Sequence, residues 1–156
     1  MKAAEADKHC QTLRKLGMRL GASDFAIENA IELAEGYDDL AVLLLEPADM
    51  EATRLNPRNL HPTIKCVDEE LANVCRTGNW RNTCIVDARP SRTDATRTSE
   101  SAEERCRRDD EAYMATKQVL NMLKPDVLLI CHCGTHPSHK GLLVTSLPPL
   151  ATLAIY

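Results

Sequence analysis

The chain has 156 residues, a formal net charge of −4 and a hydrophobic fraction of 44%. This length allows one sizeable core, so we expect a single α/β domain over residues 1–156. The acidic balance argues against a strongly basic nucleic-acid scaffold, and no apolar run reaches the roughly 18 residues of a membrane span. We therefore expect an intracellular protein, nuclear or cytoplasmic, without a membrane partner.

Residues 1–36 have a helical pattern. Leu13, Leu16 and Leu20 recur at three- and four-residue spacing, and Ser23-Asp24 offers an N-cap for a second helix. Because Gly17 and Gly21 interrupt the first pattern, we expect a frayed first helix, a firm second one and a joint near Gly21.

Short apolar runs predict strands at residues 40–45, 83–86, 127–131 and 151–156, with helices predicted at 63–74 and 103–123 between them. The run at 127–131 lies in the stretch Lys124–Gly134, bounded by Pro125 and Gly134, as in a buried strand of a parallel sheet. The tract from Ser91 to Glu104, dense in polar residues, is predicted to be a solvated loop. The order predicts a three-layer α/β/α sandwich around a mainly parallel sheet of about four strands.

Two loops follow the first two predicted strands. Glu46-Pro47 ends the first strand and leads into residues 48–62, and Asp87-Ala-Arg-Pro90 follows the second. Open α/β sheets bind their ligands outside the carboxyl ends of the strands, so these loops are the predicted site.

The order of these pieces resembles the uracil-DNA glycosylase superfamily. In its best-known branch a strand ends in Gly-Gln-Asp-Pro-Tyr, a helix begins at Pro-Pro-Ser-Leu, and a second strand ends in Leu-Leu-Asn. The matching pieces here are Leu45-Glu46-Pro47, His61-Pro62-Thr63-Ile64, Ile85-Val86-Asp87 and, for the next strand, Val127–Cys131. The resemblance spans residues 38–156 and matches by position and residue type more than by letter.

The resemblance implies roles for two carboxylates. Glu46, beside Pro47, falls where the family places the Asp that orients the attacking water and stabilises the developing sugar cation. Asp87 falls where the family uses an Asn that recognises the uracil edge, but an ionised Asp only accepts hydrogen bonds. The alternatives are a solvated loop glutamate for Glu46 and a turn-capping aspartate for Asp87.

Substrate contacts are also implied. Trp80 is a candidate platform for a base, and Pro47, Arg54, Arg58, Arg89 and Arg92 lie in the loops after the first two strands. The alternatives are a Trp packed against the sheet and a solvated run of arginines.

The family's catalytic His follows its last strand, whereas this sequence ends at Tyr156. We expect a domain truncated at its carboxyl terminus, without a stabiliser for the leaving group and with degenerate activity. If active, it would be a DNA-repair hydrolase that cleaves the N-glycosidic bond of a damaged base in DNA and needs no cofactor. The alternative is a non-catalytic module of the same fold that binds nucleic acid or protein.

A cysteine and histidine cluster follows the third predicted strand. Cys131, Cys133, His136 and His139 are a zinc-type ligand set with unusual spacing, so Cys133, His136 and His139 are weak candidates for a metal site. Cys133 is also a candidate nucleophile, while Cys131 and Cys84 are predicted to be small buried hydrophobes. The seven cysteines show no disulfide framework and are expected to be reduced.

Overall fold

The computed structural model describes residues 3–36, 39–45, 47, 62–74, 81–131 and 151–154. Its elements are, in order, α1 (Ala3–Leu20), α2 (Asp24–Ala34), β1 (Leu40–Leu44), α3 (Pro62–Val74), β2 (Cys84–Asp87), α4 (Asp94–Thr98), α5 (Ala102–Leu123), β3 (Val127–Ile130) and β4 (Ala151–Ala154). The predicted α/β class is confirmed, and most predicted boundaries agree within one or two residues.

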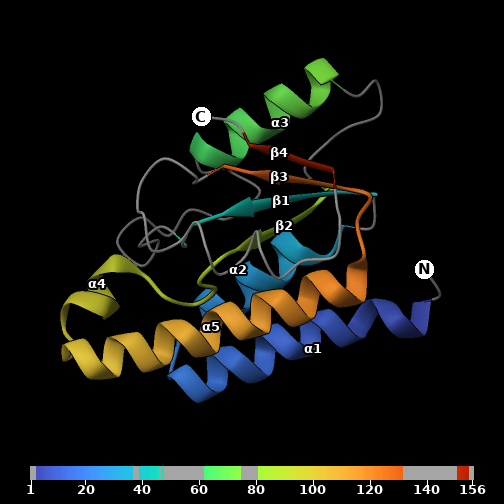
Figure 1. Ribbon diagram of the computed structural model, residues 1–156. Coiled ribbons are helices and arrows are strands. Elements are labelled where there is room, and N and C mark those ends of the chain that lie inside the picture. Colours follow the sequence, from blue (N-terminus) through green and yellow to red (C-terminus); the bar gives the residue numbers. More distant parts are fainter. Residues whose placement is uncertain are drawn as a thin grey trace.

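All strand pairs are parallel, and the strand order is β2-β1-β3-β4 (Figure 1). β1 and β3 are the inner strands and β2 and β4 lie at the edges, and Ala41, Ile85 and Leu128 of β1, β2 and β3 are buried. Residues 151–154 form β4, which pairs with β3 at the edge of the sheet. The apolar run of β1 follows from its inner position, because a central parallel strand is buried on both faces. β2 is also buried along its length, although it lies at the edge of the sheet.

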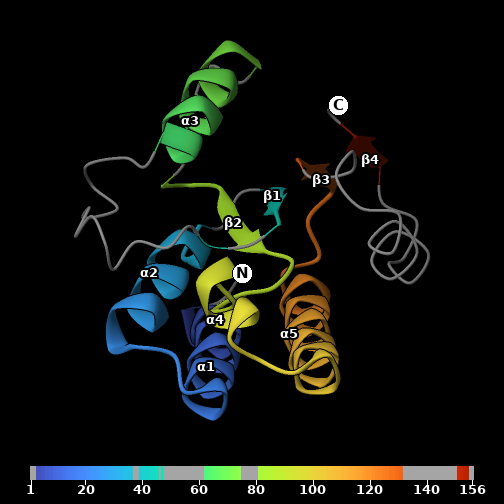
Figure 2. The same cartoon turned by 90° about the vertical axis from the view of Figure 1, so that its left-hand side faces the viewer.

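Helices lie on both sides of this sheet (Figure 2). The larger hydrophobic cluster joins α1, α2 and α5 to the sheet through residues such as Leu13, Leu43 and Val119. On the other face α3 packs Ile64 against Val42 and Ile85. Alternate residues of each strand therefore contact different helices, as the two-residue period of a strand requires.

The two amino-terminal helices meet where the sequence indicates. Ser23 caps α2 by accepting a hydrogen bond from the Ala26 amide at 3.3 Å, and Gly21 has a φ of 67° in the turn before it. The expected fraying at Gly17 is wrong, because α1 continues through this position. A Cβ at Gly17 would lie 2.5 Å from Cγ1 of Ile27, so this glycine allows α2 to pack closely.

The tract at residues 91–104 is largely exposed from Asp94 on, as predicted, but it is not a loop, and its first residues are buried. Thr93 caps the short helix α4, Ser101 caps α5, and the side chains of Ser91 and Arg92 are buried. A polar tract can be buried when its charges are paired, and here the partners come from α5, more than ten residues later in the chain.

Candidate functional site at the carboxyl end of β2

The carboxyl ends of β1 and β2 lie side by side. Leu44 pairs with Asp87 in the sheet register, and the Arg89 amide donates a hydrogen bond to the Leu45 carbonyl at 3.0 Å. Asp87 is therefore next to the chain that leads into Glu46. This edge of the sheet is where open α/β folds bind ligands.

Asp87 is held from below by α5. Asp87 is only 6% exposed. Oγ1 of Thr116 on α5 donates a 2.8 Å hydrogen bond to the backbone carbonyl of Asp87. A narrow crevice lies beside it, lined by Leu13, Ala30, Leu33, Ile85, Val86, Asp87 and Pro90. This crevice has no room for a water-sized molecule, so it is not a ready-made base pocket.

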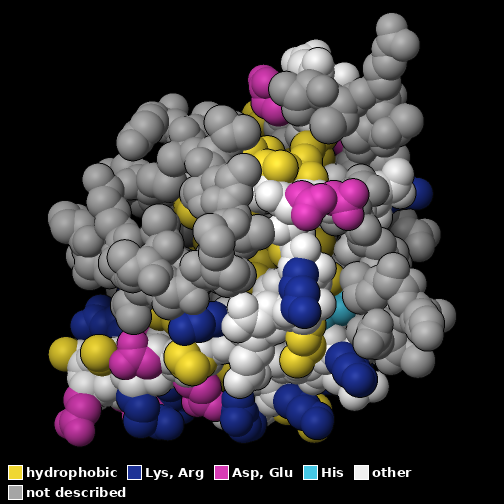
Figure 3. Space-filling view, turned by 45° about the vertical axis from the view of Figure 1, so that its right-hand side comes forward, with side chains coloured by type: hydrophobic (Ala, Val, Ile, Leu, Met, Phe, Trp, Pro, Cys, Tyr) yellow, Lys and Arg dark blue, Asp and Glu magenta, His cyan; other side chains and the backbone are white. Residues whose placement is uncertain are grey.

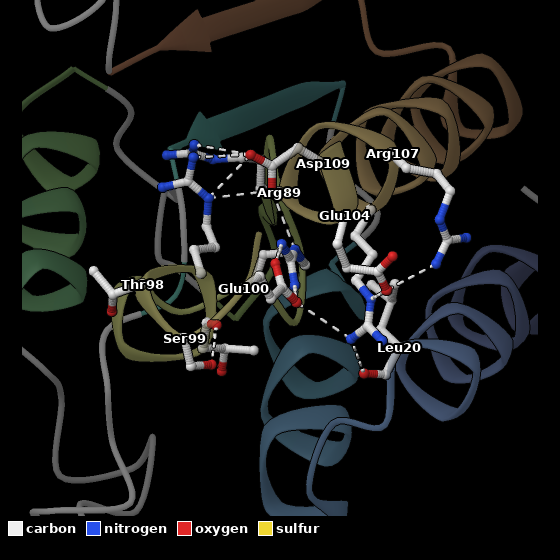
Figure 4. Close-up of polar contacts among 12 residues, drawn as sticks. Leu20, Arg89, Thr98, Ser99, Glu100, Glu104, Arg107 and Asp109 are labelled. Carbon is white, nitrogen blue, oxygen red and sulfur yellow. Dashed lines mark hydrogen bonds and ion pairs between the residues drawn. The ribbon is translucent and has the colours of Figure 1, made fainter. Parts of the chain in front are cut away.

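Three arginines from the segment after β2 converge on Asp109 of α5 (Figure 4). Arg92 Nε donates to Asp109 Oδ1 at 3.1 Å, and Arg97 Nη2 donates to Oδ2 at 2.8 Å. Arg89 Nη1 lies 3.6 Å from Oδ2. Planar guanidiniums suit this arrangement, because each presents several fixed donors to one carboxylate.

Glu100 extends the network toward α1. Both terminal nitrogens of Arg92 donate hydrogen bonds to the Glu100 carboxylate, one of them at 2.7 Å. Arg108 Nη1 lies 3.2 Å from the same carboxylate. Arg108 also donates to Glu104 at 2.5 Å and to the Leu20 carbonyl at 3.4 Å. The segment after β2 is thus tied to α5 and to the end of α1. We call Arg89, Arg92, Arg97, Glu100 and Asp109 the arginine network.

Burial and pairing act against each other in this network. Burial by itself raises the pKa of Asp109, but hydrogen bonds from Arg97 and Arg92 outweigh it and hold that pKa below its ordinary value. The hydrogen bond from Arg92 likewise lowers the pKa of Glu100. Both carboxylates are ionised at neutral pH, and Asp94 Oδ1, 4.0 Å from Arg97 Nη1, adds a third acid at the exposed edge of the network.

The position of Asp109 follows from helix geometry. Asp109, Thr116 and Leu120 lie on the buried side of α5 at spacings of seven and four residues. Near the amino-terminal end of this face, the Asp109 carboxylate accepts hydrogen bonds from the arginines. Two turns later, the Thr116 hydroxyl donates a hydrogen bond to the backbone carbonyl of Asp87 at the end of β2. One face of a single helix supports the whole segment from Asp87 to Glu100.

Ser91 occupies a strained place in the same segment. Its φ is 63°, which is uncommon for a residue other than glycine, and its buried hydroxyl has no hydrogen-bond partner in the described part of the chain. Ser91 Oγ lies near Gly17 of α1. The backbone there turns sharply between β2 and α4.

The predicted site residues divide into two groups. Asp87 and Arg89 lie together at the carboxyl end of β2, and Pro47, half-buried, follows β1. Glu46, Arg54, Arg58 and Trp80 lie outside the described residues, as do Cys133, His136 and His139, so their roles stay predictions. Arg89 and Arg92 are buried and paired with acids, so a solvated arginine run does not describe them.

Sequence reasoning missed Glu100 and Asp109. The available signal was an aspartate at a position where the helical stripe of α5 requires an apolar residue, together with three arginines in nine residues upstream. A charged residue on a core stripe indicates a buried partner. Only the fold brings these arginines to it.

The described cysteines differ in burial. Cys84 is buried as predicted, and burial raises its thiol pKa to about 12, whereas Cys131 is exposed, which corrects its predicted burial. The reason is that β3 ends at Ile130, so Cys131 lies past the packed strand. Cys10, Cys66, Cys84, Cys106 and Cys131 are not in disulfide bonds, and no group of three potential metal ligands occurs among the described residues.

Comparison of the chain with protein-family models, curated proteins and solved structures yields no match. Across the described ranges, no helix is long and apolar enough to cross a membrane.

Proposed function

We propose that this chain is a divergent domain of the uracil-DNA glycosylase type, acting at the N-glycosidic bond of a damaged base in DNA. The observation that carries the proposal is the pairing of Leu44 with Asp87. It brings the two segments that resemble the family's catalytic and base-recognition segments to one edge of a parallel sheet. A hydrolytic site needs both groups at one place.

The order of elements supports the same assignment. A strand, a helix that begins at Pro62, a second strand that ends at Asp87, further helices and a third strand follow one another as in the resembled family. The finer architecture, a complete three-layer α/β/α sandwich with a four-stranded sheet, belongs to this proposal.

In the proposed chemistry Glu46 orients the attacking water and stabilises the positive charge that develops on the sugar. Asp87 accepts hydrogen bonds from the base. An ionised carboxylate donates none, so the preferred base presents N–H donors rather than the mixed edge of uracil. The damaged base would enter from duplex DNA by extrusion from the stack.

The test is a base-release assay on single- and double-stranded DNA carrying uracil or an amino-bearing damaged base. We expect base release that Glu46→Ala abolishes. Asp87→Asn restores an amide and should shift the preference toward uracil. Asp110→Asn, an exposed change on α5, is the matched control and should leave the rates unchanged. Absence of base release by the unmodified chain, or equal rates in Glu46→Ala, rules out the catalytic proposal.

A second candidate is a non-catalytic binding module of the same fold. It is favoured by one observation: Arg89 and Arg92 are buried against Asp109 and Glu100, an arrangement that braces a surface loop without exposing a charged site. DNA binding without base release, weakening as salt rises, would support its nucleic-acid form, because phosphate contacts release counterions. Binding that is independent of salt would exclude that form.

A further inference from the structure

The helical layer beneath the sheet has two long stretches without acidic residues. Residues 8–20 of α1 and residues 112–124 of α5 contain no Asp or Glu, although the whole chain has a net charge of −4. The two helices pack against each other through Leu16, Leu20, Ala112 and Ala115. Their acid-free stretches therefore form one continuous layer, the lower layer in Figure 1.

Lysines on this layer are not neutralised by ion pairs. Arg14 is paired with Glu28 at 2.6 Å and Arg19 with Glu111 at 2.9 Å. Lys8, Lys15 and Lys117 have no ion pair with any side chain that the structure describes. Glu28 and Glu111 are paired with arginines, and the three lysines keep their positive charges unpaired among the described side chains.

Three methionines on the same layer are exposed to solvent. Met18 of α1 is 69% exposed, and Met114 and Met122 of α5 are 55% and 43% exposed. Among the described residues only one other large hydrophobic side chain, Phe25 of α2, is comparably exposed. Figure 3 shows Lys and Arg side chains along the lower part of the molecule, with hydrophobic side chains between them and Asp and Glu side chains among them toward the lower left.

Helical spacing aligns these residues into two ridges. Lys8, Lys15 and Met18 follow one another at seven and three residues along α1, and Met114 and Met122 are eight residues apart on α5. The ridges run along two adjacent helices, with a seam between them. We call Lys8, Lys15, Met18, Met114, Lys117 and Met122 the outer face.

We propose that the outer face binds an acidic amphipathic helix of a partner protein. The partner's apolar stripe covers the methionines, whose flexible thioethers adapt to varied surfaces. Its acidic residues pair with the three lysines. Such a helix covers the exposed methionines and neutralises the lysines at the same time.

Other anionic surfaces fit the face less well. A DNA backbone pairs with lysines but leaves the methionines without an apolar partner, and the outer face has no aromatic side chain for stacking on bases. An anionic membrane recruits amphipathic surfaces through large apolar side chains such as Trp, Phe and Leu, which this face lacks. A helix with Leu on one side and Glu on the other supplies both contacts.

The test uses a fluorescently labelled helical peptide with Leu on one face and Glu on the other, titrated with the full chain and followed by anisotropy. We expect saturable binding that weakens as salt rises. The double variant Lys8→Gln/Lys15→Gln should bind roughly fivefold more weakly, because two surface charge pairs are lost. Met114→Gln/Met122→Gln should weaken binding by about tenfold.

The matched control is Lys65→Gln on α3, an exposed lysine on the opposite side of the sheet, which should leave the affinity unchanged. Circular dichroism shows whether each variant is folded. Absence of saturable peptide binding, or equal loss in Lys65→Gln and Lys8→Gln/Lys15→Gln, overturns the proposal. Tighter binding of a DNA duplex or of phosphatidylserine vesicles than of the peptide, sensitive to the same lysines, overturns it in favour of that surface.

Discussion

Asp109 is the residue on which the segment after β2 depends. Its carboxylate faces Arg89, Arg92 and Arg97, and the Arg92 side chain is fully buried. Buried charges are tolerated only when they are paired, because transfer of an isolated charge from water is costly. The buried arginines therefore need the Asp109 carboxylate, and Asp109 needs the arginines, so the network does not behave as a set of independent surface pairs.

Removal of the Asp109 charge should destabilise the protein strongly. Asp109→Asn leaves the Arg92 and Arg97 guanidiniums without their shared carboxylate, and breaking a buried pair of this kind costs about 3 kcal/mol. Urea unfolding, with the midpoint compared at constant slope, measures the change.

The exposed pair of Arg14 with Glu28, which lies outside the network, provides the control. Glu28→Gln should shift the midpoint little, because solvent screens exposed pairs. Equal midpoints for Asp109→Asn and the unmodified chain would show that the network is not needed for stability.

At the scale of elements, two glycines have opposite roles. A Cβ at Gly36 would lie 2.2 Å from the Thr83 carbonyl carbon, so the end of α2 approaches the start of β2 too closely for any side chain. Gly21 has open space around it but a φ of 67°. Sterics therefore require glycine at position 36, whereas backbone conformation favours it at position 21.

These roles predict different tolerance to substitution. Gly36→Ala should lower the free energy of unfolding by about 3 kcal/mol, since the contact is with backbone that cannot move aside. Gly21→Asn should be nearly neutral, because Asn adopts the left-handed conformation with little strain. Thermal unfolding followed by circular dichroism distinguishes them, and similar losses for both variants would contradict the assignment of close approach to Gly36.

At the scale of the whole molecule, the network makes stability depend on pH. The folded-state pKa values of Asp109 and Glu100 lie below their ordinary values of 3.8 and 4.5. A depressed carboxyl pKa contributes stability that is fully present above the ordinary value and is lost as pH falls through the folded value. The contribution of the network should therefore be constant near neutrality and disappear below about pH 4.

Urea unfolding between about pH 3 and 7 checks this expectation. The unmodified chain should lose stability on acidification more steeply than Asp109→Asn, which has already lost one of the two carboxylates. Parallel curves for the two proteins would show that other carboxyl groups cause the acid sensitivity.

The amino-acid sequence by itself determined the α/β class, most element boundaries and the burial of β1, β2 and Cys84. These features depend on local signals: apolar runs, helical spacing, and caps such as Ser23. It also placed Asp87 and Arg89 in the segment after the second strand. Local periodicity suffices where neighbouring residues share one environment.

Only the tertiary structure decided that the polar tract after β2 is partly buried, that α1 continues through Gly17, and that Cys131 is exposed. Each outcome depends on residues distant in sequence: Asp109 pairs with Arg92, Ile27 packs over Gly17, and β3 ends one residue before Cys131. Charge pairing and close packing join residues that are distant in the sequence, so a local sequence pattern does not predict them.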